Sequence, residues 1–239
     1  MRPKTLSILV LLFFLLLSLT CVAQQTYVNK YDFLAGYSFL DTPSLQGIQS
    51  GFNAEAGWNV KTWVALGVDF SVFSPGSNTL TASQFNSTVQ QELGAQIREL
   101  IEAGIIPPTY QLRVPASSTV LTFSAGPQIN YRHFKPVTLF VRPALGVLHE
   151  SATVTPADPV AKALVTALIG PQLKASDNVV FYGFGGGMDF NLSTHFGVRT
   201  AADFVHYNVF SNLLDGGRNS VRFSIGPTFR FGGNILGSK

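Results

Sequence analysis

The chain has 239 residues and a formal net charge of +3, and only 12% of its residues are charged. An ordinary soluble domain carries about 25% charged residues, so a surface that faces water everywhere is disfavoured. The small net charge also argues against a basic nucleic-acid-binding surface, and we expect no nucleic-acid partner.

Residues 1–23 predict a secretory signal peptide. A positively charged start precedes an apolar run at residues 6–17, and the small residues Cys21 and Ala23 suit cleavage at this point. The apolar run is shorter than the ~20 residues that a membrane-spanning helix needs. A lipid anchor on Cys21 is the alternative. Removal of this segment leaves 14 basic and 13 acidic residues, a net charge of +1, and no cysteine. We expect residues 24–239 to form one exported domain.

Alternation of apolar and polar residues recurs along the rest of the chain and predicts β-strands, in which successive side chains lie on opposite faces. The pattern is cleanest in the last strand, where Val221, Phe223 and Ile225 alternate with Arg222 and Ser224. Eight strands are expected, at residues 31–40, 51–60, 64–74, 119–132, 137–150, 178–191, 196–210 and 221–231.

The connections between these strands are expected to alternate between long and short, with short turns after the second, fourth and sixth strands and four long loops elsewhere. The domain has no run of 18 apolar residues, so a closed β-barrel is the remaining way to span a bilayer with every backbone group paired. Short turns on one side and long loops on the other are typical of small outer-membrane barrels. A soluble lipocalin-like barrel would allow the same alternation with its apolar face inward.

Aromatic residues gather at the end of the strands that carries the short turns. Membrane barrels place a girdle of aromatic side chains at each interface, whereas aromatic residues also simply favour strands. Their gathering at one end favours the girdle, whose expected members are Tyr31, Trp58, Trp63, Tyr131, Phe190, Phe196 and Phe231.

The polar faces of the strands carry equal numbers of acidic and basic residues. Eight strands enclose a lumen that side chains just fill, and buried charges are tolerated only when they are paired and hydrogen-bonded. We therefore predict a plugged lumen with a salt-bridge network. Its expected members are Asp32, Glu55, Asp69, Asp189 and Asp203 as acids, and Arg132, Arg142, Arg199, Arg222 and Arg230 as bases.

The last strand also has a terminal motif: Ser224, Gly226, Phe229 and Phe231 follow a spacing of polar, Gly, aromatic and aromatic residues. This motif resembles the insertion signal of bacterial outer-membrane barrels, and residues 31–231 resemble the OmpA-type outer-membrane β-barrel domain. The resemblance implies a bacterial outer-membrane location, the lipid bilayer and the barrel assembly machinery as partners, and a structural, adhesive or recognition role.

Two amphipathic helices are expected in the long loops. Apolar residues recur at helical spacing in residues 82–103. Asp158 and Pro159 have the character of an N-cap and a first-turn residue before a second apolar stripe. The two helices either pack on each other and cap the barrel mouth, or form a surface that binds an extracellular protein or a lipid headgroup.

The sequence offers one weak case for catalysis. His206 with Ser211 and Asn212 faintly resembles the lipid A deacylase barrel, although the spacing from histidine to serine differs from that family. The glycine run at residues 183–187 is like a phosphate loop only superficially, because no helix follows it; room for bulky lumen neighbours explains it better. The other histidines lack metal-ligand spacing, so we expect no enzyme, metal or cofactor.

The interpretation is an all-β, eight-stranded, antiparallel, up-and-down transmembrane barrel with short helices in its external loops. We expect a monomer with a structural or surface-interaction role. A narrow pore for small solutes and, less favoured, a deacylase-like membrane enzyme are the alternatives.

Overall fold

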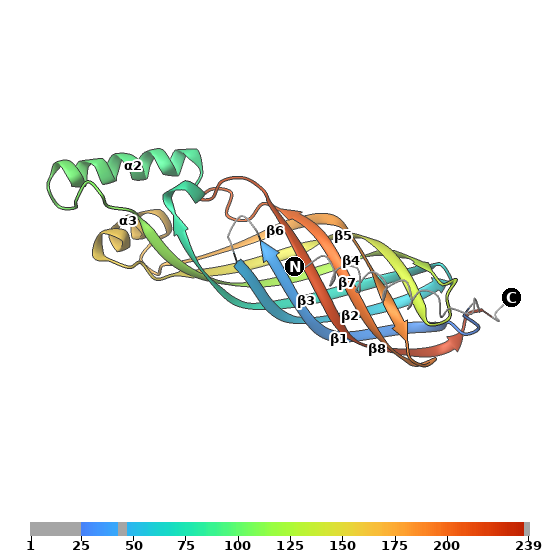
Figure 1. The fold of residues 1–239 in the computed structure, drawn as a ribbon. Coiled ribbons are helices and arrows are strands. Elements are labelled where there is room, and N and C mark those ends of the chain that lie inside the picture. Colours follow the sequence, from blue (N-terminus) through green and yellow to red (C-terminus); the bar gives the residue numbers. More distant parts are fainter. Residues whose placement is uncertain (1–24, 43–46, 237–239) are drawn as a thin grey trace, which may run out of the picture.

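The computed structural model describes residues 25–42 and 47–236, so the expected signal peptide lies outside the described residues. Eight antiparallel strands form one closed barrel in which each strand pairs with its neighbours in the chain, and β8 closes the barrel against β1. The predicted fold class, an up-and-down eight-stranded barrel, is therefore confirmed (Figure 1). The strands are β1 (Asn29–Thr42), β2 (Gly47–Lys61), β3 (Val64–Thr81), β4 (Arg113–Tyr131), β5 (Val137–Val154), β6 (Lys174–Asn191), β7 (Phe196–Tyr207) and β8 (Arg218–Asn234).

Several strands are longer than the sequence pattern predicted. The sequence Ser74-Pro75-Gly76 does not end β3, because pairing with β4 resumes after a register shift between Phe73 and Gly76. Such a bulge admits a proline, which cannot donate a ladder hydrogen bond. Beyond the bulge, β3 to β6 continue as a sheet that extends past the other strands.

Two further predicted boundaries were wrong, one because strands are longer than expected and one because a strand is shorter. Only residues 43–46 separate β1 from β2, so the first of the four expected long loops is short. The seventh strand ends at Tyr207 rather than at residue 210, since Phe210 has a φ of 53°, which a strand cannot accommodate.

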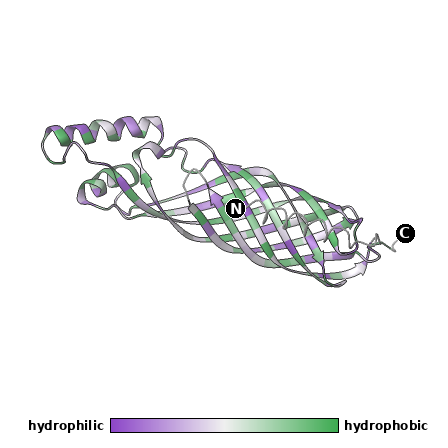
Figure 2. Ribbon diagram, viewed as in Figure 1, coloured by the Kyte–Doolittle hydropathy of each residue, from purple (hydrophilic) through white to green (hydrophobic). Residues whose placement is uncertain are grey.

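The outer surface of the barrel is apolar. Phe223, Ile225 and Phe229 of β8 are 43%, 41% and 53% exposed, whereas Arg222, which precedes them in the sequence, is 4% exposed. Figure 2 shows the same alternation of hydrophobic and hydrophilic residues along the other strands. The apolar face therefore points outward, which is opposite to the expectation for a soluble lipocalin-like barrel.

The expected aromatic residues lie at the short-turn end. Tyr31 pairs with both Trp58 and Phe231 across neighbouring strands. Six of the seven are between 38% and 55% exposed, and Phe196, the seventh, is partly buried. They form an outward-facing aromatic ring at that end of the barrel.

The barrel interior has two layers. The half near the short turns contains most of the buried charged residues, and the half near the loops is apolar. The apolar layer meets the charged one at Arg222, which shares a small gap with Leu40, Phe73, Phe181 and other apolar side chains. We call this layer the apolar plug; its members are Leu40, Phe73, Val120, Leu148, Phe181 and Val205, each at most 6% exposed.

The loops between β3 and β4 and between β5 and β6 contain the two described α-helices, which lie beyond the barrel end opposite the one where β8 ends at Asn234 (Figure 1). The first predicted helix is shorter than expected: a 3-10 turn, η2 (Ala82–Gln84), precedes α2 (Ser87–Glu102). Helix α3 (Pro159–Ile169) begins as predicted, since the Asp158 side chain accepts a hydrogen bond from Ala161 N. The buried side chains of both helices belong to one apolar cluster with the β7–β8 loop.

No helix in the described part of the chain is long and apolar enough to cross a membrane.

Candidate functional site

The charged layer of the lumen is assembled by the register of the strands. Asp189 on β6 lies directly opposite Arg199 on β7, and Asp203 on β7 lies opposite Arg222 on β8. Cross-strand pairs of opposite charge stabilise a sheet. Glu55 faces the like-charged Asp69, so these two carboxylates require cations from elsewhere in the lumen.

Arg199 is the centre of the network. Its guanidinium donates to Asp189 at 2.6 Å, to Glu55 at 3.0 Å and to Asp32 at 3.2 Å. The residue is 4% exposed. A single cation therefore joins carboxylates of the neighbouring strands β1 and β2 to that of β6.

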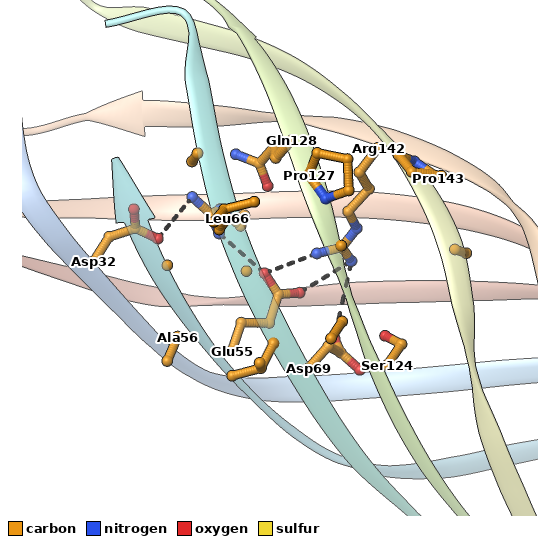
Figure 3. Close-up of a pocket in the computed structure, with 18 of the residues that line it drawn as sticks. Asp32, Glu55, Ala56, Leu66, Asp69, Ser124, Pro127, Gln128, Arg142 and Pro143 are labelled. Atoms are coloured by element: carbon orange, nitrogen blue, oxygen red, sulfur yellow. Dashed lines mark hydrogen bonds and ion pairs between the residues drawn. The ribbon is translucent and has the colours of Figure 1, made fainter. Parts of the chain in front are cut away.

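Arg142 and Arg222 hold the remaining carboxylates. Arg142 contacts Glu55 at 3.1 Å and Asp203 at 2.9 Å, with Asp69 at 3.9 Å. Arg222 donates to Asp203 at 2.7 Å and also to Asp69. Figure 3 shows Arg142 of β5 pointing toward Glu55 and Asp69. Asp32 lies at the opposite side of the same network of contacts.

The layer near the short turns differs in part from the prediction. Arg230 is 3.4 Å from Asp189. Arg132, expected in the salt-bridge network, forms no described ion pair and instead donates to Thr62 O and Asn59 Oδ1, both at 2.9 Å. It lies at the last residues of the barrel, where backbone and amide oxygens are closer than the carboxylates. The other nine predicted residues all lie in ion pairs.

Sequence reasoning missed an ion pair outside the charged layer, between the apolar plug and the loops. Arg218 and Glu150 are 3% and 4% exposed, and the closest described approach of their charged atoms is 3.7 Å. Glu150 was placed at the very end of a strand and Arg218 in a loop, so neither was assigned to the interior. The alternation itself could have located them, because Arg218 continues the inward positions of Ser220 and Arg222.

The arrangement leaves little charge available to a passing solute. The charged layer contains five acids and five arginines. Four of the arginines, Arg142, Arg199, Arg222 and Arg230, form ion pairs with these acids. The apolar plug covers this layer toward the loops. The layer is not completely packed, because its residues also line a pocket with about 490 Å³ of empty space, part of it open to solvent (Figure 3). Its buried charges are compensated by one another.

The terminal motif lies on two faces of β8. Ser224 and Gly226 point inward and are buried, whereas Phe229 and Phe231 are 53% and 54% exposed on the outer face. Gly226 packs against β1: a Cβ atom at this position would lie 2.5 Å from the Cα of Gly36. The motif therefore sits on the strand that closes the barrel.

The proposed catalytic residues are not joined. His206 Nδ1 is 2.8 Å from Asn219 Oδ1 on the outer face of β8, and no hydrogen bond links it to Ser211 within the described residues.

The glycine run lies in β6, where a Cβ at Gly187 would lie 2.7 Å from the Phe140 ring. In residues 25–42 and 47–236 no cluster of three His, Cys, Asp or Glu side chains could hold a metal ion.

A polar contact ties the β3–β4 loop to α3. The Tyr110 hydroxyl lies 3.0 Å and 3.2 Å from the two carboxylate oxygens of Asp158, the residue that caps α3. Burial, the hydrogen bond to Asp158 and the charge of that carboxylate raise the pKa of Tyr110 to about 12.

This raised pKa predicts that the loop contact between Tyr110 and Asp158 is lost at alkaline pH. A raised pKa means that the contact stabilises the fold fully below the ordinary tyrosine value near 10 and loses this effect as the pH rises through about 12. An ultraviolet titration should therefore show a late tyrosine that disappears in Tyr110→Phe and titrates earlier in Asp158→Asn, which keeps the cap. Tyr37→Phe is the control. Identical titrations for Tyr110→Phe and wild type would contradict the assignment.

Comparisons with known proteins give fold-level likenesses. No protein-family model and no curated protein matches this sequence. Among solved structures, Ail, the attachment invasion locus protein of Yersinia pestis, aligns with a TM-score of 0.48 and 15% identity over 85% of this chain and 99% of that chain. A major outer membrane protein from Thermus thermophilus aligns with a TM-score of 0.48 and 12% identity, over 84% of this chain and 99% of that chain.

Neisserial surface protein A aligns with a TM-score of 0.46 and 8% identity, over 84% of this chain and 96% of that chain. At these values none of the likenesses decides what this chain does.

Proposed function

We propose that the protein is an integral barrel of the bacterial outer membrane, exported by its N-terminal segment. The observation that carries the proposal is the apolar outer surface of the barrel, which extends from the aromatic ring toward the loops. On β3 the outward residues from Val64 to Val72 are all apolar. A stretch of about 9–11 residues in a tilted strand crosses the hydrocarbon layer.

Within the membrane the barrel acts as an anchor rather than as a channel or an enzyme. The mutual compensation of the buried charges and the apolar plug support a closed lumen. The described parts that remain free to act are the external loops, where α2 and α3 extend beyond the barrel. The proposed role is thus structural or surface-interacting, with an extracellular protein or lipid as the partner of the loops.

The OmpA-type resemblance and the assembly machinery belong to the same proposal. Gly226 and the outward aromatic pair Phe229 and Phe231 occupy the strand that completes the barrel. Assembly machinery that recognises the final strand would find this pattern exposed before the barrel closes.

One copy of the chain already closes the sheet, so a monomer suffices.

The closed lumen predicts silence in planar bilayers. We expect the purified protein to insert, shown by a heat-dependent shift in gel mobility of the membrane fraction, and to give no steady conductance steps. A porin added to the same bilayer is the control for detection. Large, steady steps that scale with the amount of inserted protein would overturn the closed lumen and favour a pore for small solutes.

A further inference from the structure

A pocket lies above the apolar plug, between the extended sheet of β3 to β6 and the loops. Its empty space is about 740 Å³, part of it open to solvent. The sheet supplies one wall through Val114 and Val154, and Val165 of α3 and Phe210 and Leu214 of the β7–β8 loop supply the opposite wall. We call this space the mouth pocket.

The pocket is hollow because part of its sheet wall is made of small residues. Ala152 on β5 lies directly opposite Ala175 on β6, and Ala116 and Ser118 continue the wall on β4. Further into the barrel along the same strands, the inward positions carry the large, buried side chains Leu148 and Phe181. The change in side-chain size along the same strands creates the space.

One polar atom in this apolar space lacks a hydrogen-bond partner among the described residues. Arg218 lines the pocket and is 3% exposed, and its Nη1 has no acceptor within hydrogen-bond distance. The nearest described carboxylate oxygen, of Glu150, is 3.7 Å away, too far for a hydrogen bond. A buried donor without a partner is costly, so a ligand that offers an acceptor gains free energy here.

The charges in the pocket restrict the acceptor. Arg218 and Glu150 already compensate each other, so a carboxylate ligand would add an uncompensated anion beside Glu150 in a low-dielectric space. A neutral carbonyl oxygen would satisfy the free N–H group without that cost. The rest of the ligand must be apolar to match the alanine, valine and leucine lining.

We propose that the mouth pocket binds a small neutral amphiphile, with an apolar chain between the alanine wall and α3 and an ester-type carbonyl oxygen on Arg218 Nη1. This site is separate from the closed lumen and would give the extracellular end of the barrel a ligand of its own. The site requires α3 and the β7–β8 loop in their described positions, because they form its outer wall.

Binding of radiolabelled methyl octanoate by equilibrium dialysis tests the site. The full chain is held in phosphatidylcholine nanodiscs, and empty nanodiscs are subtracted. We expect saturable binding of one molecule per chain. Octane should bind about tenfold more weakly, which is the usual value of one hydrogen bond to a charged group. Octanoate should also bind more weakly, because it adds an uncompensated anion beside Glu150. Absence of saturable binding, or equal binding of the three probes, would overturn the proposal.

A matched pair of variants locates the site. Ala175→Phe fills the pocket, whereas Ser176→Phe places the same ring on the outer face of the same strand. We expect loss of binding in the first and unchanged binding in the second, with the heat-dependent gel shift as the folding control for both. Equal binding by the two folded variants would overturn the location, and the probe series on the wild-type chain still tests the ligand chemistry if one variant fails to fold.

A further variant and a second lipid separate the contributions. In Arg218→Leu combined with Glu150→Leu, methyl octanoate should bind no better than octane; a retained preference for the ester would contradict the role of Arg218.

Nanodiscs of diether lipids lack ester carbonyls. Unchanged affinity in them supports a free small ester as the ligand, and higher affinity supports a membrane lipid ester as the natural occupant.

Discussion

Arg199→Met is expected to destabilise the barrel by about 3–5 kcal/mol, because breaking a buried ion pair leaves uncompensated buried charge. Asp32, Glu55 and Asp189 all contact this guanidinium at 3.2 Å or less. Methionine fills similar space without a charge. Asp32 would lose its described ion pair, and Glu55 and Asp189 would keep only Arg142 and Arg230 as ion-pair partners. The barrel would therefore unfold at a much lower urea concentration.

The matched control for this variant is Arg98→Met, which removes one charge from the exposed surface of α2. Urea unfolding in lipid vesicles, followed by the gel mobility of the unheated protein, measures both. Arg199→Lys keeps the charge but cannot bridge three carboxylates with a planar fork, so its stability should lie between wild type and Arg199→Met. Equal unfolding midpoints for Arg199→Met and Arg98→Met would show that the network contributes nothing.

Val68→Arg is expected to destabilise the inserted barrel by about 2–4 kcal/mol, the cost of an arginine on the lipid face near the bilayer midplane. Val68 is 44% exposed and lies at the centre of the apolar outward stretch of β3. Thr79→Arg, an exposed position on the same strand beyond the bulge, is the control and should be nearly neutral. The comparison uses the same vesicle unfolding assay.

If Val68→Arg were as stable as Thr79→Arg, water rather than lipid would face the middle of β3. A soluble barrel would then be the better description, and the apolar exterior would need another partner.

Alternation predicted the strands, and the charge balance of their polar faces predicted which face lies inside the barrel. The period-two pattern separates Phe223 and Phe229 from Arg222, and the balance of acids and arginines on one face indicated that this face is interior. The structure places nine of the ten residues expected in the lumen in ion pairs. Which carboxylate meets which arginine was beyond the sequence, because Arg142 contacts residues across the lumen rather than on neighbouring strands.

The sequence was less informative near the loops. Ser74-Pro75-Gly76 has the composition of a turn, yet a bulge absorbs it and the strand continues. The extension of β3 to β6 then determines where the lumen stops being filled. The mouth pocket could not be predicted, because it depends on how Ala152, Ala175 and α3 come together in space.

Nitroxide scanning of residues 64–73 in lipid vesicles tests the central claim most directly. Single cysteines along β3 are spin-labelled, and their accessibility to oxygen, which concentrates in lipid, is compared with that to a water-soluble nickel complex. The account predicts a period of two, with the outward positions 64, 66, 68, 70 and 72 accessible to oxygen and shielded from nickel. Outward positions that react with nickel more than with oxygen would show a surface in water and contradict a membrane-embedded barrel.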